Sequence, residues 1–216
     1  MAARAGPCRL CVSDYAVVSF SRPRTRRTRR TPTAVAADVD PAISVVVLIA
    51  VSGLPGTGKT TVARELAARL GAVHLSVDIA EDALLGAGLE VGWTTGVAAY
   101  EAVRAAAEQS LAIGLVVVVD AVNDSDRSRQ TWRDAAKRCG VPLRFVVIQP
   151  PPAEEHQRRL ESREGSFRHV PEPTWEQVRE RARTYEPWSD ERVEVAGSRP
   201  ADALVQDVLA ALELEP

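Results

Sequence analysis

The segment Gly53-Leu-Pro-Gly-Thr-Gly-Lys-Thr60 carries glycine, lysine and threonine at the spacing G-x-x-x-x-G-K-[ST]. Glycines allow successive backbone N–H groups to turn inward around an anion, because no Cβ stands in the way. A helix that begins at Lys59 would direct the positive end of its dipole to the same place. Only Lys59 and Lys137 are lysines among the chain's 27 basic residues. We therefore predict a phosphate-binding loop in which Lys59 reaches the β- and γ-phosphates of a nucleotide.

A nucleotide in this loop would bring a metal ion with it. The hydroxyl group of Thr60 is a predicted Mg²⁺ ligand, and Asp120, which ends the β-branched run 115–119, is the second. Asp120 could instead only cap the turn that follows it. The sequence thus predicts ATP and Mg²⁺ as ligands. The predicted nucleotide-binding residues are Gly53, Gly56, Thr57, Gly58, Lys59, Thr60 and Thr61.

Asp78 follows a second predicted strand, at residues 72–77. A carboxylate at this strand end would face the γ-phosphate, where it could accept a proton from a substrate hydroxyl group. The simpler alternative is that Asp78 caps a short helix at 79–85, and the two roles are compatible. Asp78 is therefore a candidate general base.

Arginines recur later in the chain, in the segment HQRRLESR. Arg159 and Arg163 are four residues apart and share one face of a helix. Closing over the site, they would stabilise the charge that phosphoryl transfer spreads over the γ-phosphate oxygens. Because Glu155 and Glu161 lie nearby in an arginine-rich sequence, a solvated charged face is the alternative.

These residues lie between strands and helices that alternate along the chain. Alternation predicts an α/β fold, in which helices cover both faces of a parallel sheet and ligands bind at the carboxyl ends of the strands. Expected strands are 43–51, 72–77, 115–119, 143–149 and a weaker 191–195. Expected helices are 60–70, 79–85, 96–113, 125–139, one from the prolines 150–152 to about 164, 174–186 and 201–214.

The first 41 residues differ from the rest in composition. Residues 1–40 carry eight arginines and three aspartates and show no apolar periodicity, which predicts a disordered tail (1–41) before a single domain (42–216). An organelle presequence and a nucleic-acid-binding arm are alternatives. The pair Cys8 and Cys11 has no second ligand pair downstream, so we interpret its spacing as chance.

Composition excludes several other classes. The net charge is -2, so no global positive field attracts nucleic acid, and no apolar run reaches the roughly 18 residues of a membrane span. Three cysteines cannot form a disulfide framework, which favours a cytoplasmic protein. Ala121 stands where AAA-type ATPases usually place a water-activating glutamate, and the chain has no N-K-x-D motif of switch GTPases.

Residues 43–214 resemble the P-loop kinase-like proteins grouped as AAA domain 33, relatives of the polynucleotide 5′-kinase domain, chloramphenicol phosphotransferase, gluconate kinase and zeta toxin. The resemblance is carried by GLPGTGKTT at 53–61, HLSVD ending at Asp78, VVVVDAVN ending at Asn123 and RLESR at 159–163. It implies a five-stranded sheet of order 2-3-1-4-5 and transfer of the γ-phosphate of Mg-ATP to an alcohol. It also implies that Asp78 is the base and that Arg159 or Arg163 belongs to a mobile lid.

The acceptor is expected to be a small molecule, with nucleic acid and membranes as unlikely partners. Many relatives have an arginine three residues after the strand-two aspartate, but here Glu81 stands there, followed by Asp82. This disfavours a phosphorylated acceptor and favours a neutral or cationic one, unless both acids only face solvent. A zeta-toxin-like or nucleic-acid 5′-kinase is one alternative, and a nucleotide-binding regulatory module or slow ATPase is another. Possible acceptor walls, or core residues, are Trp93, Tyr100, Trp132, Trp175 and Trp188, and His169 is a weaker candidate.

Overall fold

The computed structural model describes residues 45–162 and 167–214. The predicted tail at 1–41, with Cys8 and Cys11, lies outside the described residues, and so does Arg163. No helix within the described ranges is both long enough and apolar enough to cross a membrane.

Five strands pair in one parallel sheet in the order β2-β3-β1-β4-β5, which confirms the predicted order. The central strand, β1, is fully buried and pairs with β3 on one side and β4 on the other. Its residue Val51 is level with Asp120 and with Val146, so the carboxyl ends of these strands meet at one edge of the sheet. The strands are β1 Leu48–Ser52, β2 Val73–Ser76, β3 Val117–Ala121, β4 Leu143–Gln149 and β5 Arg192–Ala196.

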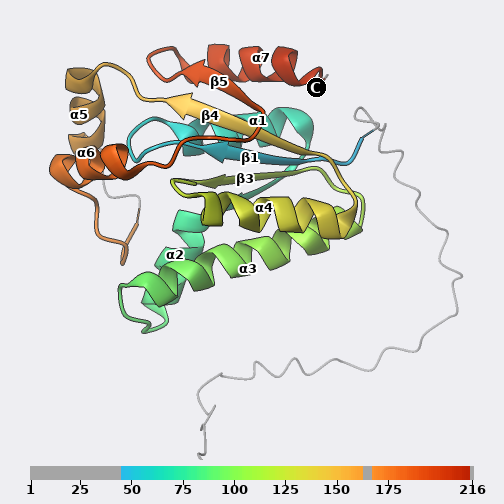
Figure 1. Cartoon of the computed structure of the whole chain (residues 1–216), viewed down its shortest axis with the longest axis horizontal. Helices are drawn as coiled ribbons and strands as arrows, with labels where there is room; N and C mark the ends of the chain where they lie inside the picture. Colours follow the sequence, from blue (N-terminus) through green and yellow to red (C-terminus); the bar gives the residue numbers. More distant parts are fainter. Residues whose placement is uncertain (1–44, 163–166, 215–216) are drawn as a thin grey trace, which may run out of the picture. The chain divides into compact units, whose positions relative to one another are not determined.

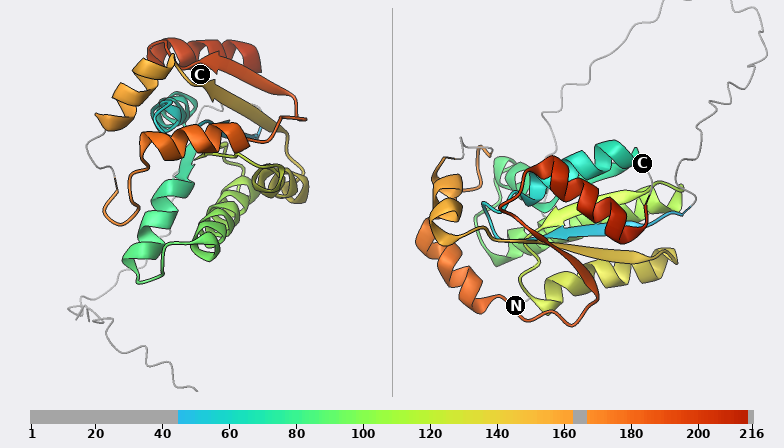
Figure 2. Two further views of the ribbon diagram at one scale, coloured as in Figure 1. Left: turned by 60° about the vertical axis from the view of Figure 1, so that its left-hand side comes forward. Right: turned by 90° about the horizontal axis from the view of Figure 1, so that it is seen from above.

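Helices cover both faces of the sheet (Figures 1 and 2). The α1 and α7 helices pack on one face, and α2, α3 and α4 pack on the other. The α5 and α6 helices lie beyond the arrowheads of the strands in Figure 1. The helices are α1 Lys59–Leu70, α2 Val77–Gly86, α3 Trp93–Ala112, α4 Asp126–Cys139, α5 Ala153–Glu161, α6 Trp175–Thr184 and α7 Ala201–Leu212.

Local sequence signals set several helix ends. A capping box begins α6, because the Thr174 hydroxyl accepts the Gln177 N–H while the Gln177 side chain accepts the Thr174 N–H. Ser125 caps α4 in the same way through Ser128. At the other end of α1, Gly71 has φ 59°, a left-handed conformation that ends the helix at little steric cost.

Some boundaries differ from the predicted ones. The first strand begins at Leu48 rather than at residue 43, because its partners β3 and β4 begin only at Val117 and Leu143. The third helix begins three residues earlier than expected, at Trp93, and the Thr95 hydroxyl donates to the Glu90 carbonyl across its start. The fifth helix ends earlier than predicted, with Glu161 as its last residue.

Candidate active site

The glycine-rich loop connects β1 to the first turn of α1, as its sequence predicts. Gly53 has no room for a side chain, since an added Cβ would lie 2.8 Å from Thr57 Oγ1 and 2.9 Å from the Ile148 carbonyl oxygen. Gly58 has φ 92°, a left-handed conformation that favours glycine, although a Cβ added there would contact nothing. The loop therefore has the tight, glycine-dependent backbone expected of a phosphate-binding turn.

Two side chains support the loop through contacts with its backbone carbonyl groups. The Thr57 hydroxyl and N–H both donate to the Leu54 carbonyl, at 2.8 and 3.3 Å, so this side chain supports the loop in the present conformation. The buried His156, on α5, places Nε2 2.7 Å from the Pro55 carbonyl oxygen, and its ring packs edge-on against Trp175. The sequence does not indicate that His156 contacts the loop, because this residue lies about a hundred positions away from it.

The Lys59 ammonium group lies 3.2 Å from Asp78 Oδ2. Lys59 is buried, whereas the Asp78 side chain is 23% exposed and lines a cavity. Asp78 lies in the first turn of α2 rather than at a strand tip, and the N-cap of that helix is Ser76. The structure thus places the predicted base beside the predicted phosphate-binding lysine.

The two predicted metal ligands also lie together. The Thr60 hydroxyl donates to Asp120 Oδ2 at 2.7 Å, and His74 Nε2 lies 2.7 Å from Asp120 Oδ1. Ser76 is paired with Asp120 in the β2–β3 register, and its hydroxyl is the buried side-chain oxygen without a hydrogen-bond partner among the described residues. Because paired residues on neighbouring strands point to the same face, three oxygen-bearing side chains converge on this end of the sheet.

These oxygens fit a magnesium ion that takes its remaining ligands from phosphates and water. Within residues 45–162 and 167–214, no group of three or more Cys, His, Asp or Glu side chains could hold a metal by itself. Thr60 and Asp120 would hold the ion, which would neutralise charge on the nucleotide phosphates. The site therefore requires a nucleotide to complete it.

Beyond β3, a buried polar network fixes the neighbouring loop. Asn123 is fully buried with φ 53°, its side-chain amide donates to Ser52 Oγ at 2.8 Å, and its oxygen accepts the Trp132 indole N–H at 2.8 Å. The equally buried Arg129 donates to the carbonyls of Asn123, Glu186 and Pro187 at 2.6–3.0 Å. This arginine thereby ties the loop after β3 to the segment after α6.

The candidate lid arginines are only partly described. Arg159 donates to the Gly197 carbonyl at 2.6 Å and pairs with Glu155 at 2.5 Å, so its guanidinium faces the loop after β5. Arg163 is outside the described ranges. Arg181 on α6, which the sequence does not single out, lines the cavity and places Nε 3.3 Å from Asp124 Oδ2.

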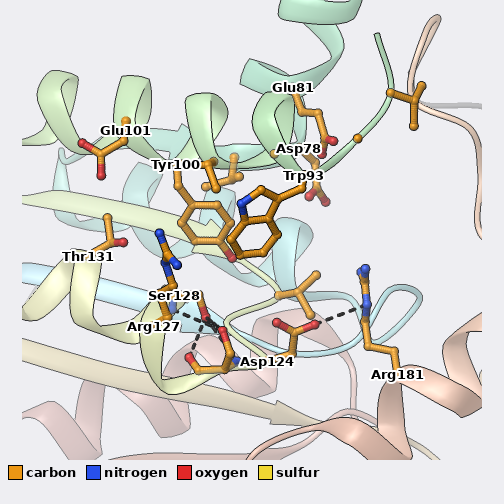
Figure 3. A pocket seen from close by; sticks show the side chains of 17 residues that line it. Asp78, Glu81, Trp93, Tyr100, Glu101, Asp124, Arg127, Ser128, Thr131 and Arg181 are labelled. Atoms are coloured by element: carbon orange, nitrogen blue, oxygen red, sulfur yellow. Dashed lines mark hydrogen bonds and ion pairs between the residues drawn. The ribbon is translucent and has the colours of Figure 1, made fainter.

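A cavity of about 460 Å³ opens beside Asp78, between α2, the start of α3 and the start of α4 (Figure 3). Asp78 and Glu81 lie close together on its α2 wall, and Asp124 and Arg181 lie on the opposite wall. A second cavity of about 510 Å³ adjoins the first, because both are lined by Asp78, Glu81 and Arg181, and Pro55 of the loop lines the second. Its size is typical of small-molecule sites.

The candidate acceptor residues divide into two groups. Trp93 and Tyr100 line the cavity, and the Tyr100 hydroxyl lies 3.3 Å from the Asn123 N–H. Burial raises the pKa of the Tyr100 phenol far above its usual range, so this group stays neutral. Of the remaining candidates, Trp132 is fully buried, and the partly buried Trp175 and Trp188 pack against hydrophobic clusters.

Asp82 and His169 form a structural contact instead. Asp82 Oδ1 accepts the backbone N–H groups of His169 and Val170 at 2.7 and 3.0 Å, which anchors the segment before α6 to α2. These hydrogen bonds lower the pKa of the Asp82 carboxyl. Of the two acidic residues that follow Asp78, only Glu81 lines the cavity.

The family model AAA_33, described as an AAA domain, matches residues 48–185, which include the loop, Asp78, Asp120 and Asn123. The chain belongs to the AAA_33 family. No curated protein matches the sequence. Membership of this P-loop kinase-like family confirms the resemblance on which the predicted strand order depends.

Solved structures share the fold of this AAA_33 protein. A sugar kinase from Janibacter sp. HTCC2649 has a TM-score of 0.60 at 17% identity, over 80% of this chain and 96% of its own. A gluconokinase from Sinorhizobium meliloti 1021 has a TM-score of 0.56 at 23% identity, over 76% and 90%. The Mycobacterium tuberculosis APS kinase CysC, in complex with AMPPNP and APS, has a TM-score of 0.58 at 20% identity, over 78% and 98%. The fold is therefore that of P-loop kinases, which bind nucleotides.

Proposed function

We propose that this protein is a kinase that transfers the γ-phosphoryl group of Mg-ATP to a hydroxyl group of a small molecule. The observation that carries the proposal is the position of Asp78, which lies 3.2 Å from the phosphate-loop lysine and also lines the cavity. A carboxylate at that junction can contact an acceptor hydroxyl in the cavity while the γ-phosphate is held by Lys59.

In the proposed reaction, the acceptor oxygen forms a bond to the γ-phosphorus as the bond from that phosphorus to the bridging oxygen of ADP breaks. Asp78 takes the hydroxyl proton. Lys59 and the loop N–H groups hold the phosphates, and Thr60 and Asp120 would hold Mg²⁺, which would supply positive charge to neutralise the phosphates. Catalysis is therefore mainly positioning and charge neutralisation.

Arg159 on α5, and Arg163 outside the described residues, are proposed to act when the site closes. To reach the transferred group, the Arg159 guanidinium must leave the Gly197 carbonyl and Glu155, which hold it in the present conformation. Arg163, four residues later, is the second proposed contact. Closure would also exclude water, which favours transfer to the acceptor over hydrolysis of ATP.

A panel of small alcohols tests the proposal. The purified protein is mixed with Mg-ATP, ADP release above background is measured for each alcohol, and the phosphorylated product is identified by mass. We expect at least one alcohol to accelerate ADP release and to gain one phosphoryl group. Slow hydrolysis that no alcohol accelerates, together with nucleotide-dependent binding of a partner protein, would instead support a regulatory module.

A further inference from the structure

We propose that the acceptor is an amino alcohol whose ammonium group binds the Glu81 carboxylate while its neighbouring hydroxyl group faces Asp78. This inference rests on the proposed kinase function and narrows its substrate class. The charges, the aromatic wall and the spacing of residues in the cavity beside Asp78 support it (Figure 3).

Most charges on the cavity wall are already neutralised by a protein partner. Asp78 pairs with Lys59 at 3.2 Å, and Asp124 pairs with Arg181 at 3.3 Å. The third acidic residue, Glu101, pairs with Arg104 at 2.7 Å. Of the two arginines that line the cavity, Arg181 is held by Asp124, whereas Arg127 lies 5.2 Å from the centre of the Trp93 ring and has no carboxylate partner among the described residues.

Glu81 is the exception. Within the described part of the chain, its carboxylate has no hydrogen bond and no ion pair. Partial burial, and then the negative charge of Asp78, raise the pKa of the Glu81 carboxyl, whereas Arg181 lowers it. Among the described residues this carboxylate has no ion pair and only the charge of Arg181 to offset its own, and a bound ammonium group would pair with it directly.

An aromatic ring and apolar side chains complete the wall around Glu81. Trp93 is 71% exposed and Val91 67%, although both are large apolar residues that proteins usually bury. In Figure 3 the Trp93 indole lies just below the Asp78 and Glu81 carboxylates. Indole faces attract cations, and the guanidinium of Arg127 already lies 5.2 Å from the centre of this ring. The exposed apolar surface of Trp93 and Val91 therefore suits the carbon skeleton of an acceptor whose cation pairs with Glu81.

The spacing of the two carboxylates limits the acceptor further. Asp78 and Glu81 are three residues apart on α2, so they are neighbours on one helix face, with Cβ atoms about 5–6 Å apart. An amine at Glu81 and a reacting hydroxyl at Asp78 must then be separated by only a few bonds. A 1,2- or 1,3-amino alcohol, including an aminosugar, meets this requirement.

Alcohols that share a skeleton but differ in charge test the inference. One set is serinol, glycerol and glycerate, and a second is glucosamine, glucose and gluconate. We expect the amino alcohol to have the highest kcat/KM of its set, about 10-fold or more above the neutral member. Glu81→Gln should lower kcat/KM for the amino alcohol about 10- to 100-fold and change that of the neutral alcohol far less. Glu90→Gln, an exposed glutamate outside the cavity, is the matched control.

The possible results separate this inference from the proposed function. A neutral or anionic member that reacts best, or equal losses for amino and neutral alcohols in Glu81→Gln, would overturn the amino-alcohol assignment and leave the kinase proposal standing. If no alcohol of any charge accelerates ADP release, both proposals fail. Thermal unfolding of Glu81→Gln checks that a loss of activity does not reflect a loss of fold.

Discussion

Lys59 and Asp78 form an ion pair, at 3.2 Å, between the phosphate loop and the acceptor cavity. The two residues are 19 positions apart, and the lysine begins α1 while the aspartate lies in the first turn of α2. In the proposed mechanism, the phosphates of ATP would take over the lysine and leave the carboxylate free to accept a proton. The pair thus links nucleotide binding to the availability of the proposed base.

Lys59→Ala should weaken Mg-ATP binding about 100-fold, because it removes a buried cation that makes charge-assisted hydrogen bonds to phosphate. Isothermal titration calorimetry measures the affinity. Lys137→Ala is the matched control, since Lys137 is the chain's only other lysine and is exposed on α4. Unchanged affinity in Lys59→Ala would contradict the phosphate-loop assignment.

Asp78→Asn should keep the affinity for ATP, or raise it slightly, because Lys59 loses a competing partner. Transfer to the acceptor should fall by about 10²- to 10⁴-fold, the usual contribution of a general base. Calorimetry gives the affinity and acceptor-dependent ADP release gives the rate. A variant with full activity would show that Asp78 only pairs with Lys59.

Ser76→Ala should raise the thermal midpoint, because the buried hydroxyl has no partner among the described residues and its burial costs about 1 kcal/mol or more. If the hydroxyl faces the metal shell, the same variant should need several-fold more Mg²⁺ for ATP binding. Magnesium titrations monitored by calorimetry measure this. The exposed Ser189→Ala should change neither quantity, and an unchanged magnesium requirement in Ser76→Ala would exclude Ser76 from the metal site.

Glu81→Gln should raise the thermal midpoint at neutral pH. The folded-state pKa of Glu81 is raised, so the folded protein binds the Glu81 proton more tightly than the unfolded chain does. As pH rises above the ordinary glutamate pKa, loss of this proton therefore lowers the free energy of unfolding. The advantage of glutamine should therefore shrink as pH falls and vanish near pH 4, at about the ordinary glutamate pKa. Thermal scans of both proteins from pH 4 to pH 8, roughly spanning that window, test this, and a pH-independent difference would contradict it.

Arg129→Ala should lower the free energy of unfolding by at least about 3 kcal/mol, because three carbonyl groups lose their donor. Urea unfolding measures the change. Arg129→Lys should recover only part of it, since an ammonium group cannot reproduce the planar fork. The exposed Arg138→Ala should cost no more than about 0.5 kcal/mol, and an equal effect of the two alanine variants would refute the role of Arg129.

Features that depend on neighbouring residues could be predicted from the sequence. The phosphate loop, the capping box at Thr174 and the placement of Asp78 and Asp120 near the loop all follow from short motifs and alternating elements. The contact of His74 with Asp120 spans 46 positions, and that of His156 with Pro55 spans 101. No local sequence pattern indicates such pairs, because the residues meet only when distant segments of the chain pack against each other. The same limit applies to Arg181, which an arginine-rich sequence does not single out.

The phosphate loop follows β1, the fully buried middle strand of the sheet. The cavity wall includes helices α2 and α3 and carries the exposed side chains of Val91, just before α3, and Trp93. Substitutions in β1 disturb the centre of the core, whereas substitutions at the exposed wall positions disturb little of it. The residues proposed to select the acceptor can therefore change while those proposed to bind ATP stay the same.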